Sequence, residues 1–434
     1  MPKSLLALTT TALLAAGTAT AADLRIYPNF GEVRQTATIT AGQVSVNLPA
    51  NLYGTVLPDS LDLDGVNVSS RSLVQQANWL GTLEGKEVTL REDGRTERVT
   101  LVRARDLLVR DAQGQYRTVQ AQNLAYDVQP PENPFSPSWQ ATFNVIGAAT
   151  GTPTLTYLTR ALSWTPRYTL KLSGSTAALS ALADIRNASE QAFNVNAAEL
   201  YAGDVQLEGN QMPVYAARMQ TFDVAAAASA APAPKVSSMG EMRGLYRYGL
   251  DGAFLLPANG SVSLPFLNPK ITTFERFGVA GMGFSTGGAR GNLNRGYRLK
   301  ADTELPAGPV TVREDGRLVG QVNVDTTSAN TAVDLNLGTD PDLKYVRAAT
   351  ATVQNKGTKT EATVVKVTYT LENAKDRATR FELTEYGVDG RGTVTGPVTR
   401  SAEGNVLVKV DVPARSGTTN GKATVTFTVT LPNT

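Results

Sequence analysis

The stretch YLTRALSWTPRYTLKL, Tyr157 to Leu172, decides the fold class of this chain. It holds Trp164, one of three tryptophans in 434 residues, and Pro166 follows two residues later. From Tyr168 onward, apolar residues recur at every second position, which predicts a strand with one buried face. Similar short runs of Val, Thr, Leu and Tyr, broken by Gly, Asn, Asp and Pro, fill most of the chain, so the sequence predicts an all-β protein.

The three marked residues of this stretch are interpreted as structural. Trp164 is large enough to anchor one sheet against another. Pro166 is expected to end or bulge its strand, and Tyr168 to continue the buried face. The alternative is a tryptophan that stacks on carbohydrate, but such platforms usually expose several aromatic rings, and Trp79 and Trp139 are the other tryptophans.

Composition excludes several classes of chemistry. The chain has no His and no Cys, so it holds no Ser-His-Asp or Cys-His nucleophile, no imidazole or thiolate metal site and no disulfide. Lys and Arg number 41 and Asp and Glu number 39, which gives a net charge of +2 without a basic cluster. A nucleic-acid partner is therefore not expected.

The N-terminus has the pattern of an export signal over residues 1–21. Lys3 is followed by an apolar stretch from Leu5 to Ala16, and Ala19-Thr20-Ala21 forms an A-x-A cleavage site. No later apolar run is long enough for a membrane helix. We expect an exported protein of the periplasm or cell surface, associated with the outer envelope.

Composition and turn signals predict four segments after residue 21. These are an N-terminal β segment (22–79), a small SH3-like barrel (80–130), a central β-sandwich (138–300) and a C-terminal β-sandwich (301–434). Asp93-Gly94 and Asp315-Gly316 are predicted hairpin turns, since both central residues need positive φ. Residues 210–244 are rich in Ala, Ser and Pro and are predicted to be an inserted loop. A Gly-rich stretch at 287–296 is also expected to be a loop.

Several motifs in chain order resemble one family. GKEVTL, LTRALSWTPRYTLKL, RNASEQAF followed by AELYAGDV, LPANGSVSLPFL and YRLKADTELPAGPVTVREDG together resemble the mucoidy-inhibitor-like family of uncharacterised bacterial exported and envelope proteins. The resemblance covers about Ser70 to Gly387. It implies the fold and an envelope location. It implies no catalytic residues, and the coiled coil common in that family is missing here.

The methionines suggest a metal alternative. After Met1, all five lie within about seventy residues around the predicted loop, and Glu241 lies between two of them; they are Met212, Met219, Met239, Met242 and Met282. Thioethers are soft ligands that suit Cu(I), and an exported copper protein could handle a small oxidant such as superoxide. Cu(II) prefers imidazole, which is absent. Methionine as an adaptable filler or contact surface is the other interpretation.

Paired carboxylates, which glycosidases require, are the remaining catalytic candidates. Glu199 with Asp204, and Glu382 with Glu385, are expected to be solvated surface groups. We therefore expect a non-enzymatic scaffold or interaction protein of the cell envelope without a cofactor, docked to outer-membrane or surface-layer proteins. Copper-dependent redox activity and binding of envelope polysaccharide are the alternatives, and homo-oligomerisation stays open.

Overall fold

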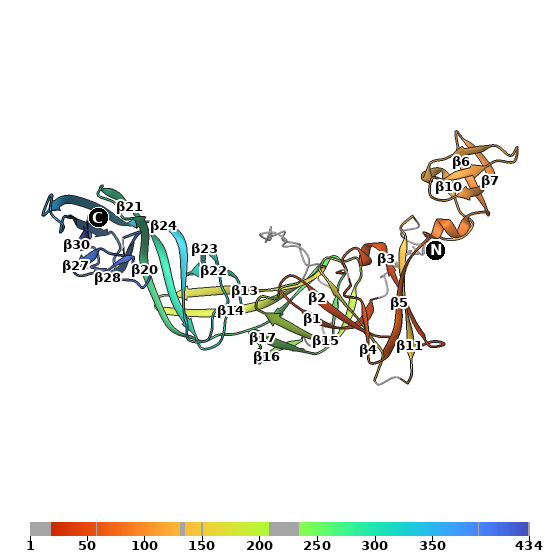
Figure 1. Cartoon of the computed structure of the whole chain (residues 1–434), viewed down its shortest axis with the longest axis horizontal. Coiled ribbons are helices and arrows are strands. Elements are labelled where there is room, and N and C mark those ends of the chain that lie inside the picture. Colours follow the sequence, from red (N-terminus) through yellow and green to blue (C-terminus); the bar gives the residue numbers. More distant parts are fainter. Residues whose placement is uncertain are drawn as a thin grey trace, which may run out of the picture. The chain divides into compact units, whose positions relative to one another are not determined.

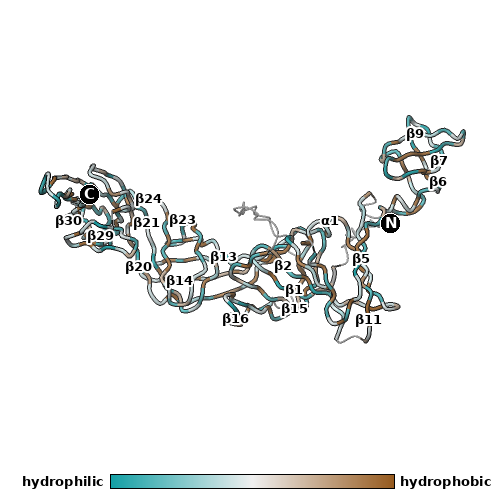
Figure 2. The backbone as a smooth tube through the Cα atoms, viewed as in Figure 1, coloured by the Kyte–Doolittle hydropathy of each residue, from teal (hydrophilic) through white to brown (hydrophobic). Residues whose placement is uncertain are grey.

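A computed structural model of the chain describes residues 19–57, 59–130, 135–148, 151–207, 234–388 and 390–432 (Figure 1). The chain is 64% strand and 3% helix, so the predicted all-β fold is confirmed. Among the described residues the strands form five sheets. Apolar and polar residues alternate along many strands (Figure 2), and this places one set in a core and the other outside. No helix in the described part of the chain is long and apolar enough to cross a membrane.

The chain divides into two compact units. The first comprises Met1–Trp164 and Asp184–Leu264, and the second comprises Thr165–Ala183 and Pro265–Thr434. The predicted boundary at residue 300 falls inside the second unit. The reason is that the hairpin just before it pairs with the C-terminal strands and not with the central ones.

The first unit contains an eight-stranded sheet in which one pair, β1 with β15, is parallel. Its strands in order are β16 (Lys235–Met242), β17 (Leu245–Asp251), β15 (Phe193–Ala202), β1 (Thr20–Ile26), β2 (Gly31–Thr36), β12 (Thr154–Thr159) and β4 (Asp62–Asp64), with β18 (Phe254–Leu256) also on β15.

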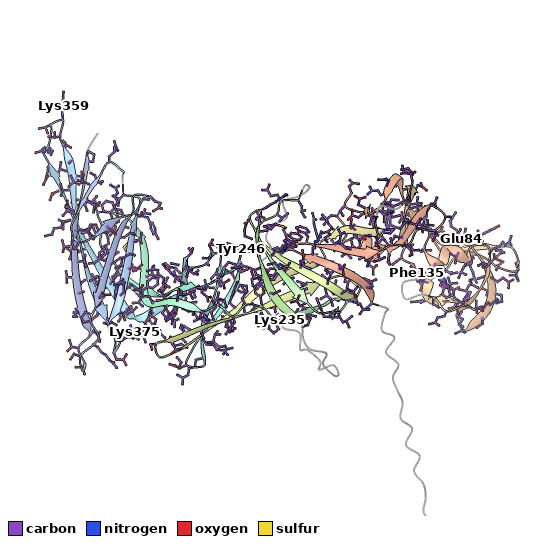
Figure 3. The ribbon with its side chains drawn as sticks, turned by 90° about the horizontal axis from the view of Figure 1, so that it is seen from below. Glu84, Phe135, Lys235, Tyr246, Lys359 and Lys375 are labelled. Carbon is purple, nitrogen blue, oxygen red and sulfur yellow. The ribbon has the colours of Figure 1, made fainter. Side chains whose placement is uncertain are left out.

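The predicted loop at 210–244 is wrong at its C-terminal end. Residues 208–233 lie outside the described residues, but Lys235–Met242 form β16, an edge strand that pairs with β17. Figure 3 labels Lys235 at the start of β16 and Tyr246 in β17. β16 has no apolar alternation, since most of its residues are exposed. The backbone hydrogen bonds between β16 and β17 hold this segment in a strand. Amino-acid composition alone does not predict such pairing.

Two smaller sheets complete the first unit. One orders β3 (Gln43–Pro49), β11 (Ser138–Ile146) and β5 (Asn67–Gln76), and the short helix α1 (Ala50–Tyr53) follows β3. The other orders β10 (Leu124–Ala125), β6 (Glu87–Glu92), β7 (Arg95–Arg103), β8 (Leu108–Arg110) and β9 (Tyr116–Thr118), with 3-10 turns at η1 (Trp79–Leu83) and η2 (Ala121–Asn123).

The sheet of β10, β6, β7, β8 and β9 occupies the segment predicted as a small barrel, and it has its own core. Leu80, Val88, Leu101 and other apolar residues are buried together there. The β6–β7 turn has φ of 50° at Asp93 and 74° at Gly94, as the predicted hairpin requires. Asp315 and Gly316 repeat this geometry.

A further sheet of five strands contains the Trp164 stretch. Its order is β19 (Gly260–Pro265), β14 (Thr176–Asn187), β13 (Leu162–Ser173), β22 (Gly308–Glu314) and β23 (Arg317–Val324). Trp164 is 1% exposed, and its indole Nε1 donates to the Tyr201 carbonyl at 2.8 Å. The buried Tyr168 hydroxyl donates to the Pro306 carbonyl at 2.9 Å. Both rings are thus buried without an unpaired polar atom.

Pro166 does not end or bulge its strand, which corrects the expectation. β13 continues through it to Ser173, and Pro166 keeps its place on the buried side of the alternation. The parallel ladder with β22 begins only at Tyr168. Pro166 therefore lies before the first β13–β22 pair, and its lack of an N–H removes no hydrogen bond from that ladder.

The nine-stranded sheet of the second unit supplies its main core. Its order is β27 (Thr393–Thr395), β30 (Gly421–Pro432), β25 (Ala362–Asn373), β24 (Ala332–Gln354), β21 (Ala289–Ala301), β20 (Ile271–Gly283), β26 (Thr379–Tyr386), β29 (Val406–Val412) and β28 (Thr399–Arg400). Its buried side chains, among them Val367, Phe381 and Phe427, form one cluster.

The Gly-rich stretch at 287–296, expected to be a loop, is mostly strand β21. Glycine serves packing there, since a Cβ on Gly296 would lie 2.7 Å from the Phe277 ring on the neighbouring strand. The absence of a side chain at Gly296 leaves room for the Phe277 ring. Composition alone does not distinguish a glycine needed for packing from a glycine in a flexible loop.

Replacing Trp164 by Ala should remove the buried indole and leave a cavity, at a cost of about 3–5 kcal/mol in the free energy of unfolding. Chemical denaturation followed by circular dichroism measures the change. Thr165→Ala, at an exposed neighbouring position, is the control and should stay within about 0.5 kcal/mol of the parent. Equal stability of the two variants would contradict the anchoring role of Trp164.

Candidate functional site

The methionines proposed as copper ligands are distributed over both units. Met239 and Met242 lie exposed on β16 in the first unit, whereas Met282 lies on β20 in the second. The sulfur of Met282 lies 3.1 Å from the Tyr369 hydroxyl oxygen. The Glu241 carboxylate accepts from the backbone N–H of Gly244. Met212 and Met219 lie outside the described residues.

Met239 is the extra residue of a β-bulge, because the register with β17 shifts between Ser238 and Gly240. A Cβ on Gly249 would lie 3.0 Å from the Met239 sulfur, so that side chain packs across the neighbouring strand. No group of three His, Cys, Asp or Glu side chains that could hold a metal occurs within the described ranges. Copper binding stays a prediction.

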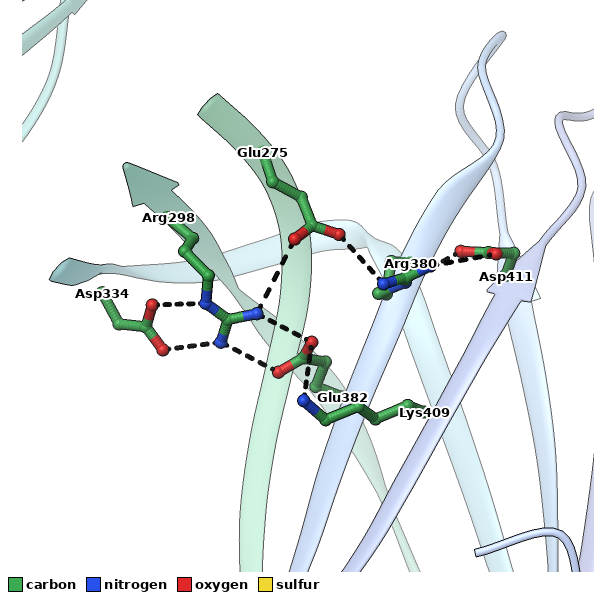
Figure 4. Close-up of polar contacts among 7 residues, drawn as sticks. All are labelled: Glu275, Arg298, Asp334, Arg380, Glu382, Lys409 and Asp411. Carbon is green, nitrogen blue, oxygen red and sulfur yellow. Dashed lines mark hydrogen bonds and ion pairs between the residues drawn. The ribbon is translucent and has the colours of Figure 1, made fainter. Parts of the chain in front are cut away.

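A ladder of ion pairs crosses one face of the nine-stranded sheet over β24, β21, β20, β26 and β29 (Figure 4). Arg298 is its centre. Its Nε lies 2.6 Å from Oδ1 of Asp334, and its Nη1 lies 3.0 Å from Oε1 of Glu382. Lys409 Nζ lies 3.5 Å from the same Glu382 oxygen.

A second guanidinium extends the ladder. Arg380 Nη1 lies 3.4 Å from Oε1 of Glu275, and its Nε lies 3.1 Å from Oδ1 of Asp411. Glu275 also approaches Arg298 Nη1 at 3.7 Å. Unlike charges therefore alternate from strand to strand, which is a favourable cross-strand arrangement.

The ladder fixes the charge state of its members. Burial raises the pKa of Glu382, but the hydrogen bonds and charges of Arg298 and then Lys409 outweigh it and hold the pKa below its ordinary 4.5. Hydrogen bonds to Asp334 and Glu382 raise the pKa of Arg298 despite partial burial. A carboxylate held ionised between two cations is a poor general acid near neutral pH.

A second ionic group lies inside the same sheet. Arg347 and Glu385 have side chains that are 1% and 0% exposed, and Arg347 Nε lies 2.6 Å from Oε1 of Glu385. The Tyr369 hydroxyl donates to the same carboxylate oxygen at 2.7 Å, and burial followed by this hydrogen bond raises the pKa of Tyr369. Arg347 also donates to the carbonyls of Ser285 and Gly287, which ties down the chain between β20 and β21.

Neither candidate carboxylate pair is seen as a facing dyad of free acids, and the expectation that Glu382 and Glu385 are solvated surface groups is wrong, because both are buried. Glu382 is held by the outer ladder and Glu385 by the buried group. The two residues are three apart on β26, so their side chains leave opposite faces of the strand. Glu199 accepts a hydrogen bond from the Tyr201 hydroxyl and lies 3.8 Å from Arg25. A two-carboxylate mechanism has no support in the described residues of these pairs.

One face of the β3–β11–β5 sheet is free of charged residues. The strand registers place the alternate residues of the three strands side by side. All of them are exposed or half-buried. We call this set the neutral polar face; its members are Gln43, Ser45, Asn47, Pro49, Ser138, Gln140, Thr142, Asn144, Ser70, Ser72, Val74 and Gln76.

Hydrogen bonds between neighbouring side chains connect this face. Gln43 Nε2 donates to Asn144 Oδ1 at 2.8 Å, and Asn144 Nδ2 donates to Ser70 Oγ at 2.7 Å. Gln76 Nε2 donates to Gln140 Oε1 at 2.8 Å. The opposite face is mostly apolar on β3 and β11, with Phe143 buried, and carries Arg71 and Gln75 on the edge strand β5. Trp139 belongs to that opposite side and stacks on Tyr53 with centroids 4.6 Å apart.

The β5 edge of the same sheet has no paired strand among the described residues. β5 is bulged at Ser69 and regular from Ser70 to Gln76. Its one charged residue in that stretch, Arg71, folds back, since Nη1 donates to the Leu61 carbonyl at 2.6 Å and Nη2 lies 3.3 Å from Asp59. Lys and Pro, which usually protect such edges, are absent from the stretch.

Glu382→Gln should lower the free energy of unfolding by about 1–3 kcal/mol at pH 7, because a charge-assisted hydrogen-bond pair is lost. The folded-state pKa of Glu382 lies below 4.5. The stabilisation is therefore complete above about pH 5 and is lost as the pH falls through the folded pKa. Denaturation at pH 7 and pH 3 should show the parent–variant difference shrinking at acid pH.

Glu372→Gln is the matched control, since Glu372 is 3.9 Å from Lys422 on the same sheet. Its effect should stay near the 0–1 kcal/mol of an exposed pair. A pH-independent Glu382→Gln difference would contradict the ladder's electrostatic origin.

Glu385→Ala should destabilise the second unit by about 3–5 kcal/mol, because Arg347 would remain buried and charged without its partner. The double variant Arg347→Met/Glu385→Leu should recover part of that loss. Recovery stays incomplete because the Ser285 and Gly287 carbonyls lose their donor. Thermal unfolding measures both. A double variant less stable than Glu385→Ala would contradict this assignment.

Comparison of the chain with models of protein families, with curated proteins and with solved structures finds no match in any of the three. The family resemblance stated from the sequence motifs therefore stays a prediction.

Proposed function

We propose that this protein is a non-enzymatic scaffold of the cell envelope, which docks an extended segment of another envelope protein by strand addition at β5. One observation carries the proposal: the regular, unpaired edge from Ser70 to Gln76. Such an edge offers a row of backbone donors and acceptors to an incoming strand. The paired state of the carboxylates in the ladder and the buried ionic group agrees with a role without catalysis.

Most other sheet edges are protected against strand addition. Within the described ranges, six edge or end strands have two or three residues, and two longer ones are interrupted by bulges at Met239 and Val319. Short and bulged edges are the usual devices against unwanted pairing. The short strands are β4, β9, β10, β18, β27 and β28. Among the longer edges, β19 and β3 end in Pro265 and Pro49, which leaves β5 as the preferred acceptor.

Export belongs to the same proposal and rests on the signal pattern at residues 1–21. Processing after Ala21 would start the mature chain inside β1, whose parallel ladder with β15 runs from Thr20 opposite Phe193. Five residues of β1, from Ala22 to Ile26, would keep their partners. The sheet order survives such processing, because β1 also pairs with β2 from Asp23 onward.

A photoreactive amino acid at Gln75, exposed on β5, should cross-link to one envelope protein in intact cells, and the adduct should map to an extended segment of that partner. The same group at Leu318 is the control, because Leu318 is 60% exposed but lies on the bulged edge β23. Mass spectrometry of the cross-linked peptides gives the result. Equal labelling from both positions, or none from Gln75, would contradict docking at β5.

A further inference from the structure

We propose that the neutral polar face binds an uncharged, hydroxyl-rich polysaccharide. This inference does not rest on strand addition at β5, because it concerns the face of the sheet and not its edge. It starts from the twelve side chains that the registers of β3, β11 and β5 place together. All except Val74 and Pro49 carry hydroxyl or amide groups, and none carries a charge.

The absence of charge selects the class of ligand. Charged residues make up 18% of the chain, and the outer face of the nine-stranded sheet carries the alternating ladder around Arg298. An anionic or cationic polymer would find no counter-charge on the neutral polar face. A second protein sheet would need many apolar side chains to pack against, and the face offers Val74 and Pro49, with Ile146 at its end. A neutral ligand rich in hydrogen-bonding groups remains.

Amides and hydroxyls match sugar hydroxyls because both partners donate and accept. Each Gln or Asn offers two N–H donors and a carbonyl acceptor, and the mutual bonds use only part of that capacity. The bonds of Asn144 to Gln43 and Ser70, and of Gln76 to Gln140, also restrict side-chain rotation before a ligand arrives. Such preorganisation lowers the entropic cost of binding.

The sheet repeats these groups at regular spacings, about 4.8 Å across strands and about 6.8 Å between alternate residues of one strand. A polymer with repeating hydroxyls can therefore contact several strands at once. A single hydrogen bond in water contributes only about 0.5–1.5 kcal/mol net. Binding is thus expected for polymers and not for single sugars.

Affinity electrophoresis of the full chain tests this in native gels containing dextran, hydroxyethylcellulose or alginate. Both neutral polymers present hydroxyls, in α- and β-linked form, whereas alginate is anionic. We expect retardation by at least one neutral polymer and none by alginate. Maltose and cellobiose at equal mass concentration should not compete.

The double variant Gln140→Ala/Thr142→Ala removes the centre of the face and should raise the apparent Kd about tenfold, since two modest hydrogen-bonding groups are lost. Thr368→Ala/Thr426→Ala is the matched control. This pair forms a cross-strand hydroxyl contact of 3.0 Å on the nine-stranded sheet, so it should keep parental affinity. Asn47→Ala/Ser72→Ala replaces the first variant if that variant does not fold by circular dichroism.

Three results would overturn the proposal: no retardation by either neutral polymer, retardation by alginate at least as strong, or unchanged retardation of the face variants. The cross-link from Gln75, which lies on the opposite side of β5, is read independently. A failed polymer assay with a positive cross-link removes this inference and leaves the proposed function standing.

Discussion

Period-two alternation is the constraint on which the whole molecule depends. Each strand that buries one set of side chains must present the other set outside. β13 shows the rule most clearly, because Trp164 and Tyr168 face inward with every polar atom bonded while Lys171 is exposed. The side chains that face away from the core, together with the edges of the sheets, therefore form the surface that the protein presents to other molecules.

Two outward surfaces of the sheets use opposite chemistry. Around Arg298, carboxylates and cations pair with one another from strand to strand, so their charges are satisfied within the sheet. Across β11, amides and hydroxyls pair in part with one another. The first arrangement stabilises the sheet, and the second leaves hydrogen-bonding capacity at the surface. The buried Arg347–Glu385 pair belongs to the interior and supports the chain before β21.

The sequence predicted those features that local pattern controls. The all-β class, the buried alternation after Trp164 and the Asp93-Gly94 turn follow from side-chain period and from φ preferences. The features it missed depend on distant partners. β16 is ordered by β17, the β22 ladder starts after Pro166, and Gly296 admits the Phe277 ring.

The neutral polar face illustrates the same limit. The alternation of Ser, Gln, Thr and Asn along β11 was visible as a period of two. Its meaning required β3 and β5, which lie about 70 to 100 residues away in sequence, to be placed beside it in register. The family resemblance could not supply that register. Local reading therefore identified strands but not the surface that they build together.

Amide hydrogen exchange in the native envelope tests the central claim most directly, because exchange reports whether backbone groups are bonded. The account predicts that amides of residues 70–76 which exchange rapidly in the purified protein become protected in the envelope, whereas the short edge strands β4 and β27 keep their rates. Identical exchange of residues 70–76 in the purified and native states would contradict it.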